Sequence, residues 1–464
     1  MIKEGDKEIY KGRWWVPNTQ KKVFGVLTII PNKEIKLELE GNLELSSKDK
    51  MILYDYLPIE EIILGDTNCG RKITLYNCNI LKLINEMHIF PNLAIIDWHF
   101  DSKEQIKFKW INIKLTHLDD WANIPLISSQ LNETNGHREI IIKIVECVPL
   151  NIKIKNFFNL KINFGYNAPL FPINQREINV KRQTNISIES FKLINIEESL
   201  NLIKKIRNFL ILATLNFIYL TQMKVFYEES KNSKRELTIY SLSDIPDEIE
   251  ELKYYDMLFT LKDIKENINE ILNNWFAKAE DFEVIFELYS ILLHSKEMSY
   301  RNSFLIMVGI LEQFHRKTME KLDITELEHK KRVDFIVDSI PDNDESKRYK
   351  NWLKEILENY SNEKNLRKKL KELLKKSNDV FNLNSREMDS LIYKVVETRN
   401  YYVHLDDAKK HLAAKGMDLF ILQKKLESIF IVTVLKELNF DNNLIKTIRE
   451  KGLLGKILTN FWKN

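Results

Sequence analysis

Hydrophobic and polar residues alternate along the first part of the chain, roughly from residue 10 to residue 190. The clearest runs are 35–40, 106–110 and 151–155, where apolar side chains occupy every second position. Such alternation, punctuated by Gly, Asn and Pro, is typical of antiparallel strands that bury one face. The pattern therefore predicts a β-rich region with a sandwich-like or barrel-like core.

The hydrophobic period changes near Asn195, after which apolar residues recur every three or four positions. This spacing predicts a helix over 196–223 and a helical chain beyond Pro246. Between them we expect one more strand over 236–241. The helices expected there are 248–277, 282–295, 301–321, 327–339, 347–376, 385–402, 408–438 and 442–462. We therefore predict an α+β protein, with a β-rich sandwich-like region over 1–242 that ends in a helix and an all-α helical bundle over 243–464.

Composition narrows the class of protein without naming a function. The 464 residues are 44% hydrophobic and 30% charged, which fits a globular protein and excludes a disordered one. The net charge of +3 is too small to indicate a nucleic-acid-binding protein by bulk charge. The 3 cysteines cannot form a disulfide framework. The N-terminus lacks a signal-peptide core, and no apolar stretch is long enough to cross a bilayer. We expect a cytoplasmic protein with no membrane partner.

A candidate catalytic motif lies near the C-terminus, where the chain reads Arg399-Asn400-Tyr401-Tyr402-Val403-His404. An arginine holds a phosphate with a fork of donors and keeps its charge, and a histidine exchanges protons near neutral pH. These groups suit cleavage of RNA by its own 2′-hydroxyl: a base removes the proton, an acid protonates the leaving 5′-oxygen, and a cation stabilises the phosphorane. This chemistry needs neither a metal nor a cofactor, and we expect none.

The spacing of Arg399 and His404 needs an explanation. Five residues along an ideal helix rotate by about 500° around its axis, so the two side chains would point about 140° apart. The periodic apolar run ends near Tyr402, and Asp406 or Asp407 is a good N-cap for the next helix. We therefore expect His404 at or just beyond a helix end, where its ring can turn toward Arg399. From spacing alone, the favoured explanation of the motif is a surface arginine beside a helix-terminal histidine that the helix dipole stabilises.

These residues resemble the HEPN superfamily, whose helical bundles carry an Arg-x(4–6)-His motif, often with a polar residue after the arginine. The whole chain resembles the ApeA family of bacterial anti-phage HEPN proteins. The segments 12–17, 25–27 and 37–41 (GRWWVP, GVL and LELEG) resemble the opening of that family's N-terminal domain. The segment 304–314 (FLIMVGILEQF) resembles its early HEPN helix, which carries an acidic residue near its end.

The resemblance implies a metal-independent endoribonuclease that acts in abortive anti-phage defence as a homodimer or higher homo-oligomer. It implies that Arg399 stabilises the scissile phosphate, that His404 is the general acid or base, and that Asn400 orients the phosphate or the histidine. Glu312 is a candidate for positioning Arg399, although a structural Glu–Arg pair fits as well. Structured RNA such as tRNA is the expected substrate. We expect the β-rich region to sense a phage-derived trigger or to restrain the nuclease.

Other features have a structural explanation beside a functional one. The basic run 364–376 suits a phosphate-tracking helix or a solvated amphipathic helix. Its candidate RNA-binding residues are Arg367, Lys368, Lys371 and Lys375. No set of His or Cys residues has the spacing of a metal site. The alternative function is a non-catalytic HEPN-fold adaptor whose β-rich domain binds a ligand.

Overall fold

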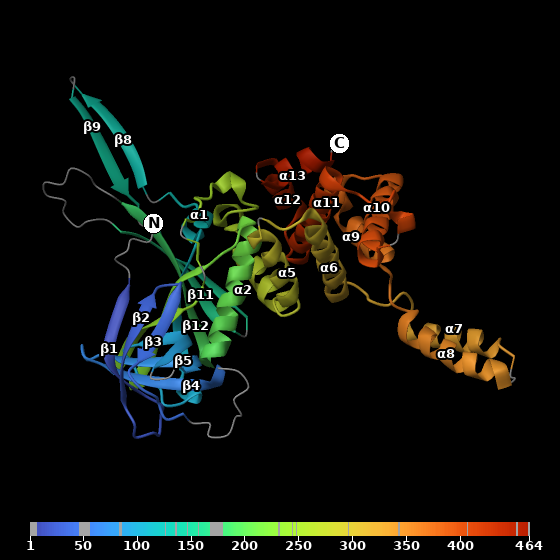
Figure 1. Ribbon diagram of the computed structural model, residues 1–464. Helices are drawn as coiled ribbons and strands as arrows, with labels where there is room; N and C mark the ends of the chain where they lie inside the picture. Colours follow the sequence, from blue (N-terminus) through green and yellow to red (C-terminus); the bar gives the residue numbers. More distant parts are fainter. Residues whose placement is uncertain are drawn as a thin grey trace. The chain divides into compact units, whose positions relative to one another are not determined.

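The computed structural model describes residues 7–45, 56–82, 86–125, 127–134, 137–145, 147–155, 157–167, 180–230, 233–243, 245–246, 248–295, 297–341, 344–405, 407–451 and 453–462. It confirms a β-rich first part followed by a helical second part (Figure 1). The chain divides into two compact units, Met1–Asn273 and Asn274–Asn464.

The first six strands close into an antiparallel barrel in the order β6-β3-β2-β1-β4-β5, with β5 returning to pair with β6. Apolar residues at alternate positions point inward, and Trp14 is fully buried among them. Position 65 must be glycine, because a Cβ there would lie 2.3 Å from the indole ring of Trp14. The strands are β1 Glu8–Trp15, β2 Val23–Ile30, β3 Glu34–Leu39, β4 Tyr56–Thr67, β5 Lys72–Lys82 and β6 Met87–Ile96.

Strand β6 also joins the barrel to an extended antiparallel sheet. Its first residues pair with β3, whereas Leu93–Ile96 pair with β14, from which the sheet continues in the order β13-β7-β12-β11-β10. These strands are β7 Lys107–Leu115, β10 Leu150–Ile154, β11 Phe158–Asn167, β12 Lys181–Asn195, β13 Leu220–Ser230 and β14 Ser233–Ser241. The strands β8 Ile127–Thr134 and β9 His137–Ile144 form a separate two-stranded hairpin.

Helix α2, Ile196–Thr214, packs its apolar side on β7 and β12 of this sheet. Its N-terminus is held by a capping box between Asn195 and Glu198. The predicted helix over 196–223 is therefore too long: Leu215 adopts a left-handed conformation that ends α2, and Leu220 begins strand β13. The predicted strand over 236–241 is confirmed as part of β14.

The chain after Pro246 continues to pack on the first unit. The backbone N–H groups of Leu258 and Phe259 both donate to the carbonyl of Ala213 at the end of α2. The Asn273 side chain donates to the carbonyl of Lys153 and accepts from the N–H of Lys155. The expected helix over 248–277 is correspondingly broken into η2 Tyr254–Asp256, α3 Leu261–Ile264 and α4 Ile268–Lys278. The compact units thus divide at 273/274, further along the chain than the 242/243 boundary expected from the change of period.

Helix α11 is the centre of the second unit, because it is apolar and buried around most of its circumference. Its Phe430 contacts the rings of Phe286, Tyr289 and Phe314. Helices α6, α9 and α13 pack around it. The helices of this unit are α5 Glu283–His294, α6 Tyr300–Thr318, α7 Glu326–Asp338, α8 Asp344–Tyr360, α9 Leu366–Phe381, α10 Ser385–His404, α11 Gly416–Glu437, α12 Asn442–Lys451 and α13 Leu453–Trp462, with η3 Asp407–Lys409 before α11.

The helix expected over 347–376 is two helices, α8 and α9. The buried Asn362 between them bonds both the N–H and the carbonyl of Ile324 through its side chain. Asn365 then caps α9 by accepting from the N–H of Lys368. These side-chain bonds hold the backbone out of helical geometry, so α7 and α8 form a helical hairpin between α6 and α9.

A buried histidine makes the stability of the helical unit depend on pH. The Nε2 atom of His315 lies 2.7 Å from Glu372, whereas the buried Nδ1 has no hydrogen-bond partner among the residues that the structure describes. Burial lowers the pKa of His315 from its usual value, opposed by Glu372 and assisted by the charges of Lys364 and Lys369. Protonation at Nδ1 would bury an N–H group with no acceptor, which explains the direction of this shift.

We expect acidification to destabilise the chain through this residue. A lowered pKa in the folded state means that the unfolded chain binds the proton more readily. The contribution of neutral His315 to the free energy of unfolding is therefore complete above about pH 6.5, and it is lost as the pH falls through the folded-state pKa. Thermal unfolding followed by circular dichroism should show a lower midpoint at about pH 5.5 than at about pH 7.5. His315→Gln should reduce this difference, and His411→Gln, at an exposed position, should not. An equal pH response in all three proteins would contradict the prediction.

Candidate catalytic site on helix α10

The candidate motif occupies the last two turns of α10. The helix begins with a capping box, in which Asn384 accepts from the N–H of Glu387 and the Glu387 carboxylate accepts from the N–H of Asn384. The residues Met388, Ile392, Val395 and Thr398 recur every three or four positions and are all buried. This buried stripe fixes the rotation of the helix and leaves the motif side chains on its remaining surface.

Helix α10 continues through His404, two residues further than the apolar pattern predicts. Leu405 ends it in a left-handed conformation with φ +52°, a geometry that costs a leucine about 1–2 kcal/mol. Since His404 is still helical, Arg399 and His404 remain about 140° apart around the axis. Asp406 lies outside the described residues, and Asp407 begins η3 rather than the long helix, which starts only at Gly416.

Two other segments of the chain hold the end of α10 in place. The N–H of Ala414 donates to Thr398 Oγ1 at 3.0 Å, and the Tyr402 hydroxyl donates to the Ala414 carbonyl at 3.0 Å. From α6, the Arg301 guanidinium donates to the carbonyl of Tyr402 at 3.1 Å and lies 5.4 Å from the centre of its ring. These bonds fix the backbone that carries Arg399 and His404.

The reactive groups themselves have few partners. Arg399 Nη1 donates to Asn400 Oδ1 at 3.4 Å, so the asparagine contacts the arginine. His404 is exposed and has no hydrogen bond or ion pair with any residue that the structure describes. No described bond joins Arg399 to His404. The donors of Arg399 and the ring of His404 remain available to a phosphate-bearing ligand.

Glu312, the candidate for positioning Arg399, lies on α6 and is partly buried. No hydrogen bond or ion pair between Glu312 and Arg399 occurs within the described part of the chain, and its role stays a prediction. Arg301 of α6 does reach α10, by donating to the carbonyl of Tyr402. Its partner is a main-chain carbonyl 101 positions away, and nothing in the local sequence signals such a contact.

The basic run on α9 is largely neutralised by acidic residues. Lys368 pairs with Asp323 at 2.6 Å, and Lys371 pairs with Asp389 at 2.9 Å. Arg367 stands over the ring of Tyr393 at 5.8 Å, and Lys375 is exposed without an ion-pair partner among the described residues. The apolar stripe Leu370, Leu373 and Leu374 is buried, as expected for an amphipathic helix. Binding of RNA by these four cations remains a prediction.

The two halves of the chain each match a known domain family. Residues 9–275 match the family ApeA N-terminal domain 1, and residues 305–444 match the family Apea-like HEPN. The chain belongs to the ApeA family. Both matches confirm the resemblance found in the sequence, and they identify this ApeA protein as a HEPN-type defence protein. Neither a curated protein nor a solved structure matches the chain.

The HEPN match contains helices α7 to α11 in full, and thus the entire Arg399–His404 motif. Within the described residues, no helix combines the length and apolar character needed to cross a membrane. The same residues bring together no group of three or more His, Cys, Asp or Glu side chains suited to a metal ion. The fold and family of this ApeA protein thereby rest on both halves of the chain.

Proposed function

We propose that the HEPN domain of this protein is a metal-independent endoribonuclease that cuts RNA through attack of the 2′-hydroxyl in abortive anti-phage defence. The observation that carries the proposal is the end of α10, where a braced helix presents Arg399 and His404 with free donor and acceptor groups. The bonds from Ala414 and Arg301 fix the backbone of this helix end, while the side chains of Arg399 and His404 stay open to a phosphate-bearing ligand.

Each motif residue has a distinct part in the proposed reaction. His404 transfers the proton, either from the 2′-hydroxyl or to the leaving 5′-oxygen. Arg399 stabilises the extra negative charge that develops on the phosphorane. Asn400 accepts a hydrogen bond from Arg399 and orients its guanidinium toward the phosphate. The reaction produces a 2′,3′-cyclic phosphate and a free 5′-hydroxyl, so no water or metal enters the first step.

A second copy of the chain completes the proposed site. Arg399 and His404 diverge by about 140° on one helix, so one copy alone directs them to different sides. The apolar side chains next to His404 in the sequence are exposed, with Val403 at 48% and Leu405 at 65% exposure. Burial of such residues between two copies would bring two motifs together and offset the strain at Leu405.

The substrate and trigger follow from the same proposal. Structured RNA such as tRNA suits this site, since its exposed loops hold nucleotides that can be splayed out for in-line attack. The β-rich N-terminal unit would sense a phage-derived trigger or restrain the nuclease until infection. The protein would act in the cytoplasm, where both RNA and phage products are present.

Incubation of the purified protein with total RNA in excess EDTA tests the proposed activity. We expect cleavage to persist in the chelator and to leave 2′,3′-cyclic phosphate ends, which end-specific ligation and repair enzymes distinguish from 3′-hydroxyl ends. Cleavage that stops in EDTA and returns with added Mg²⁺ would contradict a metal-independent reaction. Absence of cleavage under all conditions, including lysate from phage-infected cells, would favour the non-catalytic adaptor.

A further inference from the structure

The extended sheet of the N-terminal unit has two different faces. One face is apolar and lies against α2, with Ile113, Ile188 and Leu160 among its buried residues. The strand register places two rows of mostly polar side chains on the opposite face. The first row is Phe226, Trp110, Glu189, Asn159 and Lys153, and the second row is Lys224, Asn112, Ser187, Lys161 and Asn151. We call this surface the amide face.

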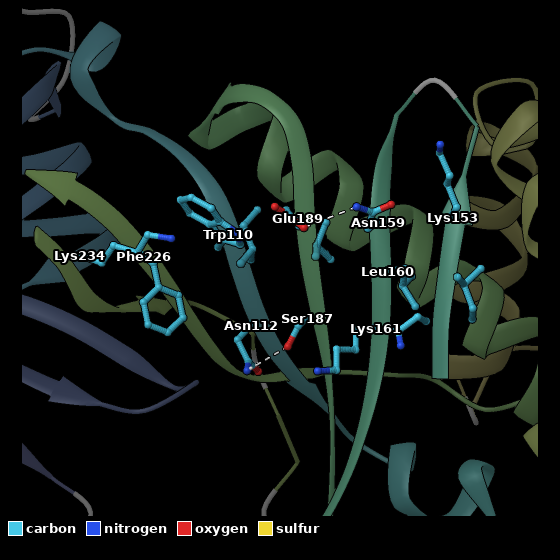
Figure 2. Close-up of a pocket in the computed structure, with 14 residues that line it drawn as sticks. Trp110, Asn112, Lys153, Asn159, Leu160, Lys161, Ser187, Glu189, Phe226 and Lys234 are labelled. Carbon is cyan, nitrogen blue, oxygen red and sulfur yellow. Dashed lines mark hydrogen bonds between the residues drawn. The ribbon is translucent and has the colours of Figure 1, made fainter. Parts of the chain in front are cut away.

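The amide face is hollowed into a groove of about 630 Å³. Residues of six strands line it. Figure 2 shows Trp110 and Phe226 at one end and Lys153 and Lys161 at the other. Its amide and hydroxyl groups are aligned by bonds to one another, including Asn112 to Ser187 at 3.3 Å and Asn159 to Glu189 at 3.5 Å. A groove of this volume accommodates a ligand of several rings rather than a single ion.

The charge in the groove favours an anionic ligand. Three lysines line it, Lys153, Lys161 and Lys234, against the single acid Glu189. The ammonium groups of Lys153 and Lys161 are exposed and have no ion pair or hydrogen bond among the residues that the structure describes. They lie on adjacent strands, β10 and β11, and on the same face of the sheet. Two unpaired ammonium groups on one face of a sheet suit contacts to two separate phosphate groups.

The aromatic end of the groove suits a flat ring. Trp110 and Phe226 are direct cross-strand neighbours and both are partly exposed. The Lys234 ammonium lies 3.5 Å and the Lys109 ammonium 4.8 Å from the centre of the Trp110 ring. An exposed cation–π contact contributes about 0.5–1 kcal/mol, whereas stacking of a base on an aromatic side chain contributes about 1–3 kcal/mol. A nucleobase can therefore displace the Lys234 side chain from the ring.

We infer that the amide face binds a short single-stranded segment of RNA. The aromatic pair stacks an unpaired base, the asparagine and serine groups bond base edges, and Lys153 and Lys161 neutralise two phosphates. The two rows of side chains cross five strands, which at about 4.8 Å spacing span about 19 Å between the outer two. This length is enough for several stacked nucleotides at about 3.4 Å each. Open sheets with exposed aromatics recognise unpaired bases in this manner. The inference does not depend on the proposed cleavage, because it concerns the N-terminal unit alone.

Binding of a fluorescent single-stranded RNA of about ten nucleotides tests the inference. The full chain carries His404→Ala, so that a failure of cleavage and a failure of binding are measured separately. Lys153→Gln with Lys161→Gln should reduce the slope of log affinity against log salt by about 1.4, since each phosphate contact on a single strand contributes about 0.7. Trp110→Ala should weaken binding about tenfold, and a duplex of the same sequence should bind less tightly.

A matched control changes the same charge elsewhere on the unit. Lys11 and Lys21 are exposed lysines of the barrel, and Lys11→Gln with Lys21→Gln should leave the salt slope unchanged. Cross-linking with 4-thiouridine RNA should label peptides that contain Trp110 or Phe226. The inference would be overturned if both double variants lost the same amount of salt slope, or if cross-links were confined to residues 274–464. It would also be overturned if polyglutamate displaced the labelled RNA as well as unlabelled RNA does. Absence of binding would overturn it as well.

Discussion

Replacement of His404 by alanine is expected to lower the rate of RNA cleavage by at least about 100-fold, since a positioned general acid or base contributes about 10²–10⁴ to such reactions. The folded chain should be unaffected, because the side chain is exposed at the last turn of α10 and makes no described hydrogen bond or ion pair. Single-turnover cleavage of a labelled RNA measures the rate, and thermal unfolding checks the fold.

His411→Ala provides a matched control. This histidine is also exposed, follows the motif by seven positions, and lies in the segment between η3 and α11. Its loss should change the rate by less than about threefold, within the ordinary effect of a surface substitution. Equal activity of the His404 and His411 variants would remove His404 from the reaction. The proposed function would then lose its proton-transfer group.

The secondary structure was predictable from the sequence wherever apolar residues recur with one period over a whole segment. Alternation at 35–40 became β3, and the three- and four-residue spacing of 385–402 became α10. The prediction failed over 215–223, because a short apolar run has no distinguishable period. There the tertiary pairing of β13 with β7 decides the conformation. Closure of the barrel by β5 and β6 likewise depends on pairing that no local pattern encodes.

The motif was readable because Arg399, Asn400 and His404 lie within six consecutive residues. The groups that hold the motif in place could not be found from the sequence, since Arg301 and Ala414 contact α10 only in the folded chain. The same limit explains the basic run on α9. A sequence shows the positive charges but not the distant partners Asp323 and Asp389, which the fold supplies. Charge at a surface is therefore a property of the fold as much as of the segment.

Arg399→Ala is expected to reduce cleavage about 10²–10³-fold, because it removes the cation that stabilises charge in the transition state. Arg399→Lys should recover only part of this loss, as an ammonium group lacks the planar fork that holds two phosphate oxygens. Arg386→Ala, at an exposed position in the first turn of the same helix, is the matched control and should remain active. Full activity of the lysine variant would show that only the charge is needed.

Mixing the two inactive variants distinguishes a shared site from two separate ones. If Arg399 of one copy acts with His404 of the other, a dimer of Arg399→Ala and His404→Ala chains retains one complete pair. Random exchange makes half of the dimers mixed, so the activity should return to about a quarter of the wild-type value. A mixture of either variant with the chain carrying both substitutions should stay inactive. Failure of the complementary mixture to recover, with subunit exchange shown by a labelled chain, would place each catalytic pair within a single copy. The divergence of the two side chains on α10 argues for recovery.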